Sequence, residues 1–177
     1  MIKVNMKNVT IFRNEKDGRV FYRTTIGHKK QDGKFDNAGI AVQFPKDVDL
    51  ADRTVINSEN AFLTFYKNKD GIPVYYIFVA THKEGQVDGP RGITLVADDQ
   101  MIFKNEKDGN VFYRTTVGHK KPDGEYENAA ITIRFKKGIE LPDRAKVGVS
   151  NAILDHYKNK EGIYVFFIMV FDFEITG

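Results

Sequence analysis

The sequence predicts an all-β chain that folds as two tandem five-stranded barrels, and three observations predict it. The 22 residues FRNEKDGRVFYRTTIGHKKQDG, which begin at Phe12, recur almost unchanged as FKNEKDGNVFYRTTVGHKKPDG from Phe103. Short runs of β-branched and aromatic residues alternate with Gly, Asn and Asp turns, which is the pattern of strands and hairpins. No stretch shows the period of a long amphipathic helix.

The repeat covers the whole chain at a constant offset of 91 residues, so that 1–86 align with 92–177 without a gap. A unit of this length is a duplicated domain, because solenoid units run to about 20–50 residues. Between the copies lies HKEGQVDGPRG, from His82, whose glycines and charges predict a short linker. We therefore expect a first domain at 1–82, a linker at 83–91 and a second domain at 92–177.

Each copy is expected to form five strands, which in the first copy lie at residues 9–14, 19–29, 38–44, 54–66 and 72–81. The first hairpin turn is KDG, where Gly18 supplies the positive φ that a tight turn needs. QDG and NKDG mark two further turns. Residues 45–53 are polar and leave room for one helical turn at most, and the fourth strand is expected to break near 58–60.

This order of elements predicts an OB-fold barrel in each copy. Three strands in a meander, a crossing segment and a final hairpin are the parts of that five-stranded barrel. An SH3-like barrel has a similar number of strands and is the alternative. The length of the first three strands favours the OB-fold.

The layout also resembles the bacterial and phage single-stranded DNA-binding protein family. GRVFYRTTIGHKKQDG, ENAFLTFYKNKDGIPVYYIFVA and their second copies match the outline of that family. The resemblance implies binding of single-stranded DNA in replication or repair, with no cofactor. Three features depart from the family: the region after the third strand is short for a helix, Trp is absent, and the chain ends in VFDFEITG instead of a flexible acidic tail.

Alternation along the second strand places Phe21 and Arg23 on one face, and Val20 and Ile26 on the other. We expect Val20 and Ile26 to fill the barrel, which leaves Phe21 and Arg23 outside. A ring beside an arginine suits a base stacked next to a phosphate. In the alternative, Phe21 is buried and Tyr22 is the exposed ring. The second copy gives Phe112 and Arg114.

The third strand and the loops supply further candidates for nucleic-acid binding. Gln43 and Arg134 are expected beside the outer face of the second strand. Phe35 and Tyr126 precede the third strand, where a ring either stacks on a base or caps the barrel end. Loop lysines would follow phosphates, although lysine in a hairpin is often ordinary solvation. These lysines are Lys29, Lys30, Lys67 and Lys69, with Lys120, Lys121, Lys158 and Lys160 in the second copy.

Composition and motifs favour a non-catalytic intracellular protein. The chain has no cysteine and no apolar run of bilayer length, so we expect a cytoplasmic protein with no membrane association. It contains no phosphate-binding loop, nucleophile elbow or metal-ligand spacing, so no catalytic residue, metal or cofactor is expected. Lys and Arg outnumber Asp and Glu by 14 to 10 in residues 1–86, whereas the counts are 13 and 14 in 87–177. A basic surface is therefore expected on the first half.

The leading hypothesis is binding of single-stranded DNA by two linked barrels. RNA is an open alternative, and both a monomer and a homodimer are compatible with it. A different class of function is a protein-interaction module, with one barrel for nucleic acid and the other for dimerisation or a partner.

Overall fold

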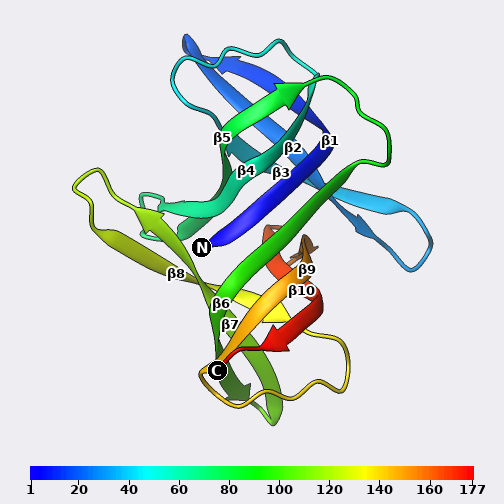
Figure 1. Ribbon diagram of the computed structural model, residues 1–177, viewed down its shortest axis with the longest axis vertical. Coiled ribbons are helices and arrows are strands. Elements are labelled where there is room, and N and C mark those ends of the chain that lie inside the picture. The colour runs from blue at the N-terminus through cyan, green and yellow to red at the C-terminus, as the bar shows by residue number, and fades with distance from the viewer.

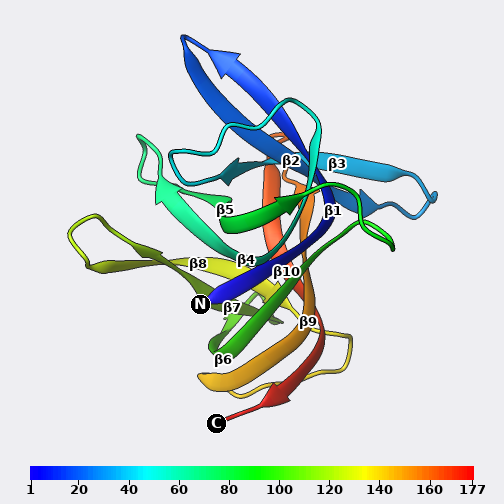
Figure 2. The same ribbon diagram turned by 45° about the horizontal axis from the view of Figure 1, so that its top comes forward.

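The computed structural model describes all 177 residues, which form ten strands and no helix. None of the elements is therefore a helix of the length and apolarity that crossing a membrane requires. Figures 1 and 2 show two barrels stacked end to end along the long axis. The strands are β1 (Ile2–Lys16), β2 (Arg19–Lys29), β3 (Phe35–Gln43), β4 (Thr54–Lys67), β5 (Pro73–Glu84), β6 (Gly92–Lys107), β7 (Asn110–Lys120), β8 (Tyr126–Arg134), β9 (Ala145–Lys158) and β10 (Tyr164–Ile175).

In the first barrel, strand pairing closes a ring in the order β1-β2-β3-β5-β4. All neighbours are antiparallel except β3 and β5, which run parallel, and β4 returns to β1. The second barrel repeats this ring as β6-β7-β8-β10-β9, with β8 and β10 parallel. This five-stranded Greek-key ring is the OB-fold, so the predicted fold class is confirmed and the SH3-like alternative is wrong.

Inward-facing residues of alternating strands fill each barrel, as a small closed barrel requires. Ile11, Ile40, Ile56 and Ile77 are buried in the first barrel, and their counterparts in the second are buried as well. The segment between β3 and β4 forms turns and no helix, in line with the sequence. Its Leu50 is buried, and the Leu50 N–H donates to Tyr22 Oη at 2.9 Å. In the second barrel, Leu141 N–H donates to Tyr113 Oη at 2.9 Å.

The two barrels are joined by an antiparallel pairing of β1 with β6. Lys3 lies opposite Val96, and Asn5 lies opposite Thr94. Thr94 is the repeat counterpart of Lys3, and Val96 is the counterpart of Asn5. Exchanging the copies therefore maps the pairing onto itself, so a pseudo-twofold axis relates the barrels.

Side chains across the interface follow the same axis. Thr64 Oγ1 donates to Gly118 O at 3.2 Å and lies 3.3 Å from His119 Nδ1. At the related place Asp155, the counterpart of Thr64, accepts from Nδ1 of His28 at 2.9 Å. The interface thus has one geometry and two sets of side chains.

Several predicted strands were too short. The first strand begins at Ile2 instead of residue 9, because residues 2–7 pair with the second barrel. The fifth strand continues to Glu84. The fourth strand is not broken near 58–60 as predicted: it is continuous from Thr54 to Lys67, and a bulge shifts its register against β5 on both sides of Asn60.

The segment between the barrels, residues 85–91, is held against the first barrel. Asn8 is buried, adopts a φ of 53°, and its side-chain amide donates to Val87 O at 2.9 Å and Gly89 O at 3.0 Å. Its Oδ1 accepts from Val87 N–H at 2.9 Å. A guanidinium nitrogen of Arg91 donates to Thr25 O. The predicted division into 1–82, 83–91 and 92–177 stays a prediction.

Candidate nucleic-acid interface

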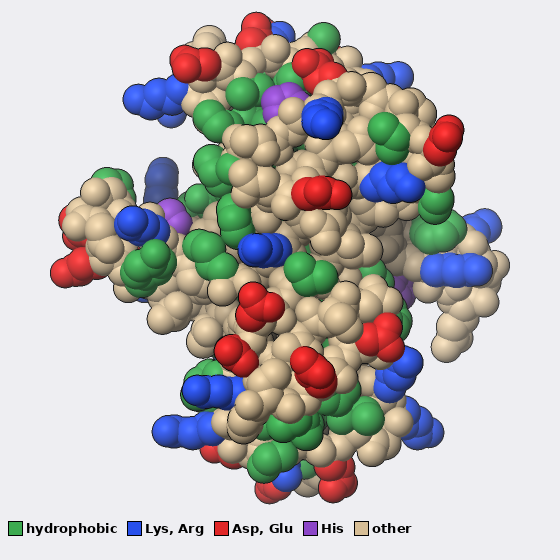
Figure 3. Space-filling view, in the orientation of Figure 1, with side chains coloured by type: hydrophobic (Ala, Val, Ile, Leu, Met, Phe, Trp, Pro, Cys, Tyr) green, Lys and Arg blue, Asp and Glu red, His purple; other side chains and the backbone are tan.

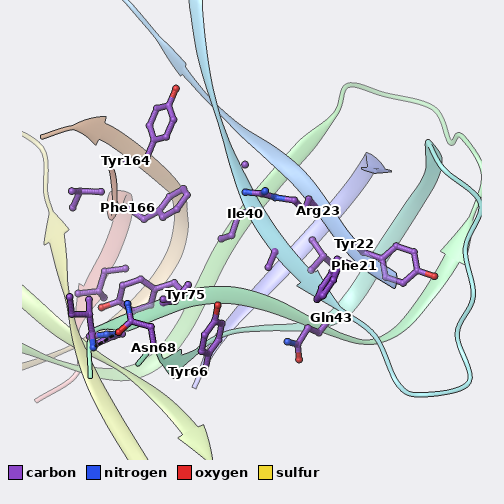
Figure 4. A pocket seen from close by; sticks show the side chains of 18 of the residues that line it. Phe21, Tyr22, Arg23, Ile40, Gln43, Tyr66, Asn68, Tyr75, Tyr164 and Phe166 are labelled. Atoms are coloured by element: carbon purple, nitrogen blue, oxygen red, sulfur yellow. Dashed lines mark hydrogen bonds between the residues drawn. The ribbon is translucent and has the colours of Figure 1, made fainter. Parts of the chain in front are cut away.

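A groove of about 1410 Å³ opens between the barrels on the outer faces of β2, β3, β7 and β8, and we call it the inter-barrel groove. The hairpins β4–β5 and β9–β10 form its other walls (Figure 4). Its lining contains both members of repeat pairs such as Arg23 and Arg114, and Asn68 and Asn159. The pseudo-twofold axis therefore passes through the groove.

Strand β2 presents Phe21 and Arg23 to the groove. The Phe21 side chain is 48% exposed, whereas Tyr22 faces inward and packs on the core. The alternative in which Phe21 is buried and Tyr22 exposed is therefore wrong. Val20, expected inside, is 38% exposed. That expectation was wrong because the β1–β2 hairpin extends past the end of the barrel, so its tip has no interior to fill.

The two third-strand candidates lie in different places. Gln43 lines the groove next to Phe21 (Figure 4). Arg134, its counterpart, is not among the groove residues. Its guanidinium carbon lies 4.1 Å from the centre of the Phe167 ring and 5.7 Å from that of Tyr157. In the second barrel, a cation therefore covers rings at this position.

Phe35 and Tyr126 lie near the tips of the β2–β3 and β7–β8 hairpins, directly after the turn, and outside the groove. Their side chains are 66% and 65% exposed. Rings with this exposure do not fill the end of a barrel, so the capping alternative is wrong. Both rings are free to stack on a ligand, and their part in binding stays a prediction.

None of the eight candidate loop lysines lines the groove. They lie on hairpins that project beside the opposite barrel. Figure 3 shows basic side chains on the two parts of the molecule that project to either side. Lys67 and Lys121 come from different barrels and share Glu127, at 3.6 Å and 3.7 Å. The Nζ of Lys158 lies 5.1 Å from the centre of the Tyr164 ring. Lys29, Lys30, Lys69, Lys120 and Lys160 are exposed.

Sequence reasoning missed several groove residues, because the hairpins that carry them reach across to the other barrel. These are Tyr66, Tyr75, Tyr164 and Phe166, together with Lys46 after β3. Tyr75 Oη donates to Ala130 O, and Tyr164 Oη donates to Asp36 Oδ1 at 3.2 Å. Burial raises the pKa of the Tyr75 phenol above its ordinary value of 10.0, with a smaller opposing effect of Arg114, so the phenol stays a neutral donor.

The candidate site thus combines aromatic side chains with Arg23, Lys46 and Arg114, against the two carboxylates of Asp49 and Glu161. Aromatic faces stack on bases of any sequence, and arginine and lysine attract phosphates. No group of three or more His, Asp or Glu side chains is placed to hold a metal ion.

The fold is similar to that of the single-stranded DNA binding protein from Thermus aquaticus. The wild-type structure of that protein aligns with a TM-score of 0.50 and 8% identity, over 99% of this chain and 92% of that one. A deletion variant aligns with a TM-score of 0.51 and 9% identity, over 98% and 92%. No family model and no curated protein matches the chain. The resemblance inferred from the repeated motifs is confirmed as a shared fold.

Proposed function

We propose that the protein binds single-stranded DNA in the inter-barrel groove and catalyses no reaction. The observation that carries the proposal is the lining of this groove. Phe21 and Tyr66 are large exposed rings, and Arg23 and Arg114 belong to the same lining on the outer faces of two OB barrels. The similarity of the fold to that of a protein named as a single-stranded DNA binding protein, from Thermus aquaticus, supports it.

Stacking and charge have separate parts in this proposal. Each base stacked on a ring contributes about 1–3 kcal/mol, whatever the base. Each phosphate neutralised by a cation adds about −0.7 to the slope of log affinity against log salt concentration. The three groove cations alone therefore predict a slope of about −2. Loop lysines that also reach the strand would make the slope steeper.

Fluorescence anisotropy of labelled dT30, titrated with the protein at low and moderate salt, tests the proposal. We expect binding that weakens with salt, and competition by unlabelled dT30 but not by duplex DNA. Reversing both groove arginines, as Arg23→Glu with Arg114→Glu, should abolish binding. The matched control reverses Lys16 and Lys107, two counterpart lysines at hairpin tips outside the groove, and should retain most of the affinity.

Competition with rU30 decides between DNA and RNA, since neither ring nor cation distinguishes the two sugars. Absence of dT30 binding at low salt would overturn the proposal.

The protein-interaction alternative is favoured by one observation in the second barrel. A separate groove of about 570 Å³ is lined by Ile139, Phe171 and Phe173 and is bordered by Asp98, Asp172 and Glu174. Its carboxylates would repel a nucleic acid. If the dT30 titration fails, this surface makes the adaptor function the better hypothesis.

A further inference from the structure

Two equivalent arginines of the inter-barrel groove point in opposite directions along their strands. Arg23 is directed away from Phe21 and lies against Gly39 (Figure 4). Arg114 is instead directed towards Phe112, and its guanidinium carbon is 5.8 Å from the centre of that ring. No such contact covers Phe21, which is 48% exposed and lines the groove, whereas Phe112 is only partly exposed and is not among the groove residues.

The sequence difference that accounts for this lies on the neighbouring strand. Arg23 is opposite Ala41, and Gly39 is opposite Thr25, one step further from Phe21 on the same face. A Cβ atom on Gly39 would lie 2.9 Å from Nη2 of Arg23 and 3.2 Å from its Cζ. A side chain at residue 39 would therefore displace the guanidinium from its present place. At the equivalent position Ala130 carries a Cβ, and Arg114 turns the other way, over Phe112.

We propose that Gly39 and Ala130 decide which barrel stacks bases, an inference that rests on the proposed binding of single-stranded DNA. Gly39 is a positioning residue: it holds Arg23 away from Phe21 and so leaves the ring free for a base. Ala130 directs Arg114 onto Phe112, whose face is then occupied by a cation. The first barrel supplies the stacking, and the second supplies mainly charge.

A second pair of positions shows the same division. Tyr66 is an exposed ring of the groove with no cation over it, and it belongs to the same barrel as Phe21. Its counterpart Tyr157 is 43% exposed, almost as much as Tyr66, but it lies outside the groove and the guanidinium carbon of Arg134 is 5.7 Å from the centre of its ring. The residue equivalent to Arg134 in the first barrel is Gln43, which has no charge to place over a ring. Both differences leave rings of the first barrel uncovered.

The test compares single and double variants in the dT30 anisotropy assay. Phe21→Ala should raise the dissociation constant about five- to 150-fold, which is the loss of one stacked base. Phe112→Ala should change it less than about twofold. Gly39→Ala should weaken binding in the same direction as Phe21→Ala, because Arg23 must move towards the ring. Gly39 has no positive φ, so alanine fits its backbone, and thermal unfolding should show an intact fold.

Double variants separate positioning from a general structural effect. In the Gly39→Ala background, the effect of Phe21→Ala should shrink to less than about threefold, because the ring is already covered. In the Ala130→Gly background, Phe112→Ala should become harmful, because Arg114 can leave the ring. A structural effect of Gly39→Ala would leave the effect of Phe21→Ala unchanged.

Three outcomes overturn the inference: equal effects of Phe21→Ala and Phe112→Ala, full additivity of Gly39→Ala with Phe21→Ala, or an unchanged response of Phe112 after Ala130→Gly. The proposed function fails separately, if the wild-type protein does not bind dT30 at all.

Discussion

The two barrels agree in their backbone and differ in the side chains that face the groove and each other. The pairing ring, the bulged fourth strand and the bond from Tyr22 or Tyr113 to the crossing segment are the same in both. The interface positions differ: Phe65 is buried in the first barrel where the second has His156. Duplication has thus preserved what closes a barrel, while the surfaces that meet another molecule or the other barrel have diverged.

The histidine shows what such a difference does. His156 Nε2 lies 2.9 Å from Ile26 O and 3.1 Å from Asp36 O, and both partners are acceptors. The ring therefore carries its proton on Nε2 and donates it across the interface. Its Nδ1 is buried without a hydrogen-bond partner. The second barrel thus contributes a polar contact where the first contributes only a packed ring.

The largest expected effect is at the packed ring. Phe65 is fully buried, and its ring centre lies 5.8 Å from that of His119 in the second barrel. Phe65→Ala should lower the free energy of unfolding by about 3–5 kcal/mol, through lost burial and the cavity left behind. Chemical denaturation measures this. A loss below about 1 kcal/mol would mean that the site collapses and that the ring matters little to the interface.

The next largest effect on stability is expected at His156, the polar counterpart of Phe65. His156→Phe makes the two interface positions alike but removes the donor to Ile26 O and Asp36 O, so stability should fall by about 1–3 kcal/mol. The same denaturation experiment measures it. An equal or higher stability would show that the histidine is not needed to satisfy these carbonyls.

Where the barrels agree, matched variants should behave alike. Tyr113→Phe removes the acceptor of the buried Leu141 N–H, and Tyr22→Phe removes that of Leu50 N–H. Each should lower stability by about 1–2 kcal/mol, with the larger value for Tyr113, because its bond is buried and that of Tyr22 only partly so. A loss of stability in only one of the two variants would contradict the expected likeness of the two barrels at this position.

The smallest effect is at Tyr75, which corresponds to Phe166 in the repeat. Tyr75→Phe removes one bond to Ala130 O and should cost about 0.5–1.5 kcal/mol at neutral pH. Because the folded-state pKa of Tyr75 is raised above 10.0, its neutral form stabilises the fold below that pH, and this contribution is lost as the pH rises through the folded value. Wild-type stability should therefore fall above pH 10, and the variant's should fall less. Identical alkaline profiles would contradict this.

The barrels could be predicted because the residues that specify each strand and turn are close together in the sequence. Turn residues and a period of two place Phe21 and Arg23 outside a strand whose other face is buried, wherever the rest of the chain lies. The early start of β1 could not be predicted, since residues 2–7 pair with a strand some ninety positions away. The same is true of Tyr164 and Phe166, which reach the groove only because the barrels are docked.

The orientations of Arg23 and Arg114 could not be predicted from the sequence, for a different reason. Arg23 and Arg114 lie in identical local sequences, FYRTT. The direction of each side chain depends on whether a neighbouring strand carries glycine or alanine, and that contact is visible only once the register of β2 on β3 is known.

The dyad through the groove has one more consequence, for direction. A nucleic-acid strand runs from 5′ to 3′, and rotation by half a turn reverses it. A strand laid straight over the axis therefore meets one copy in the forward sense and the other in the reverse sense. Two identical halves would accept either direction equally, so only the differences between the copies give the bound molecule a head and a tail.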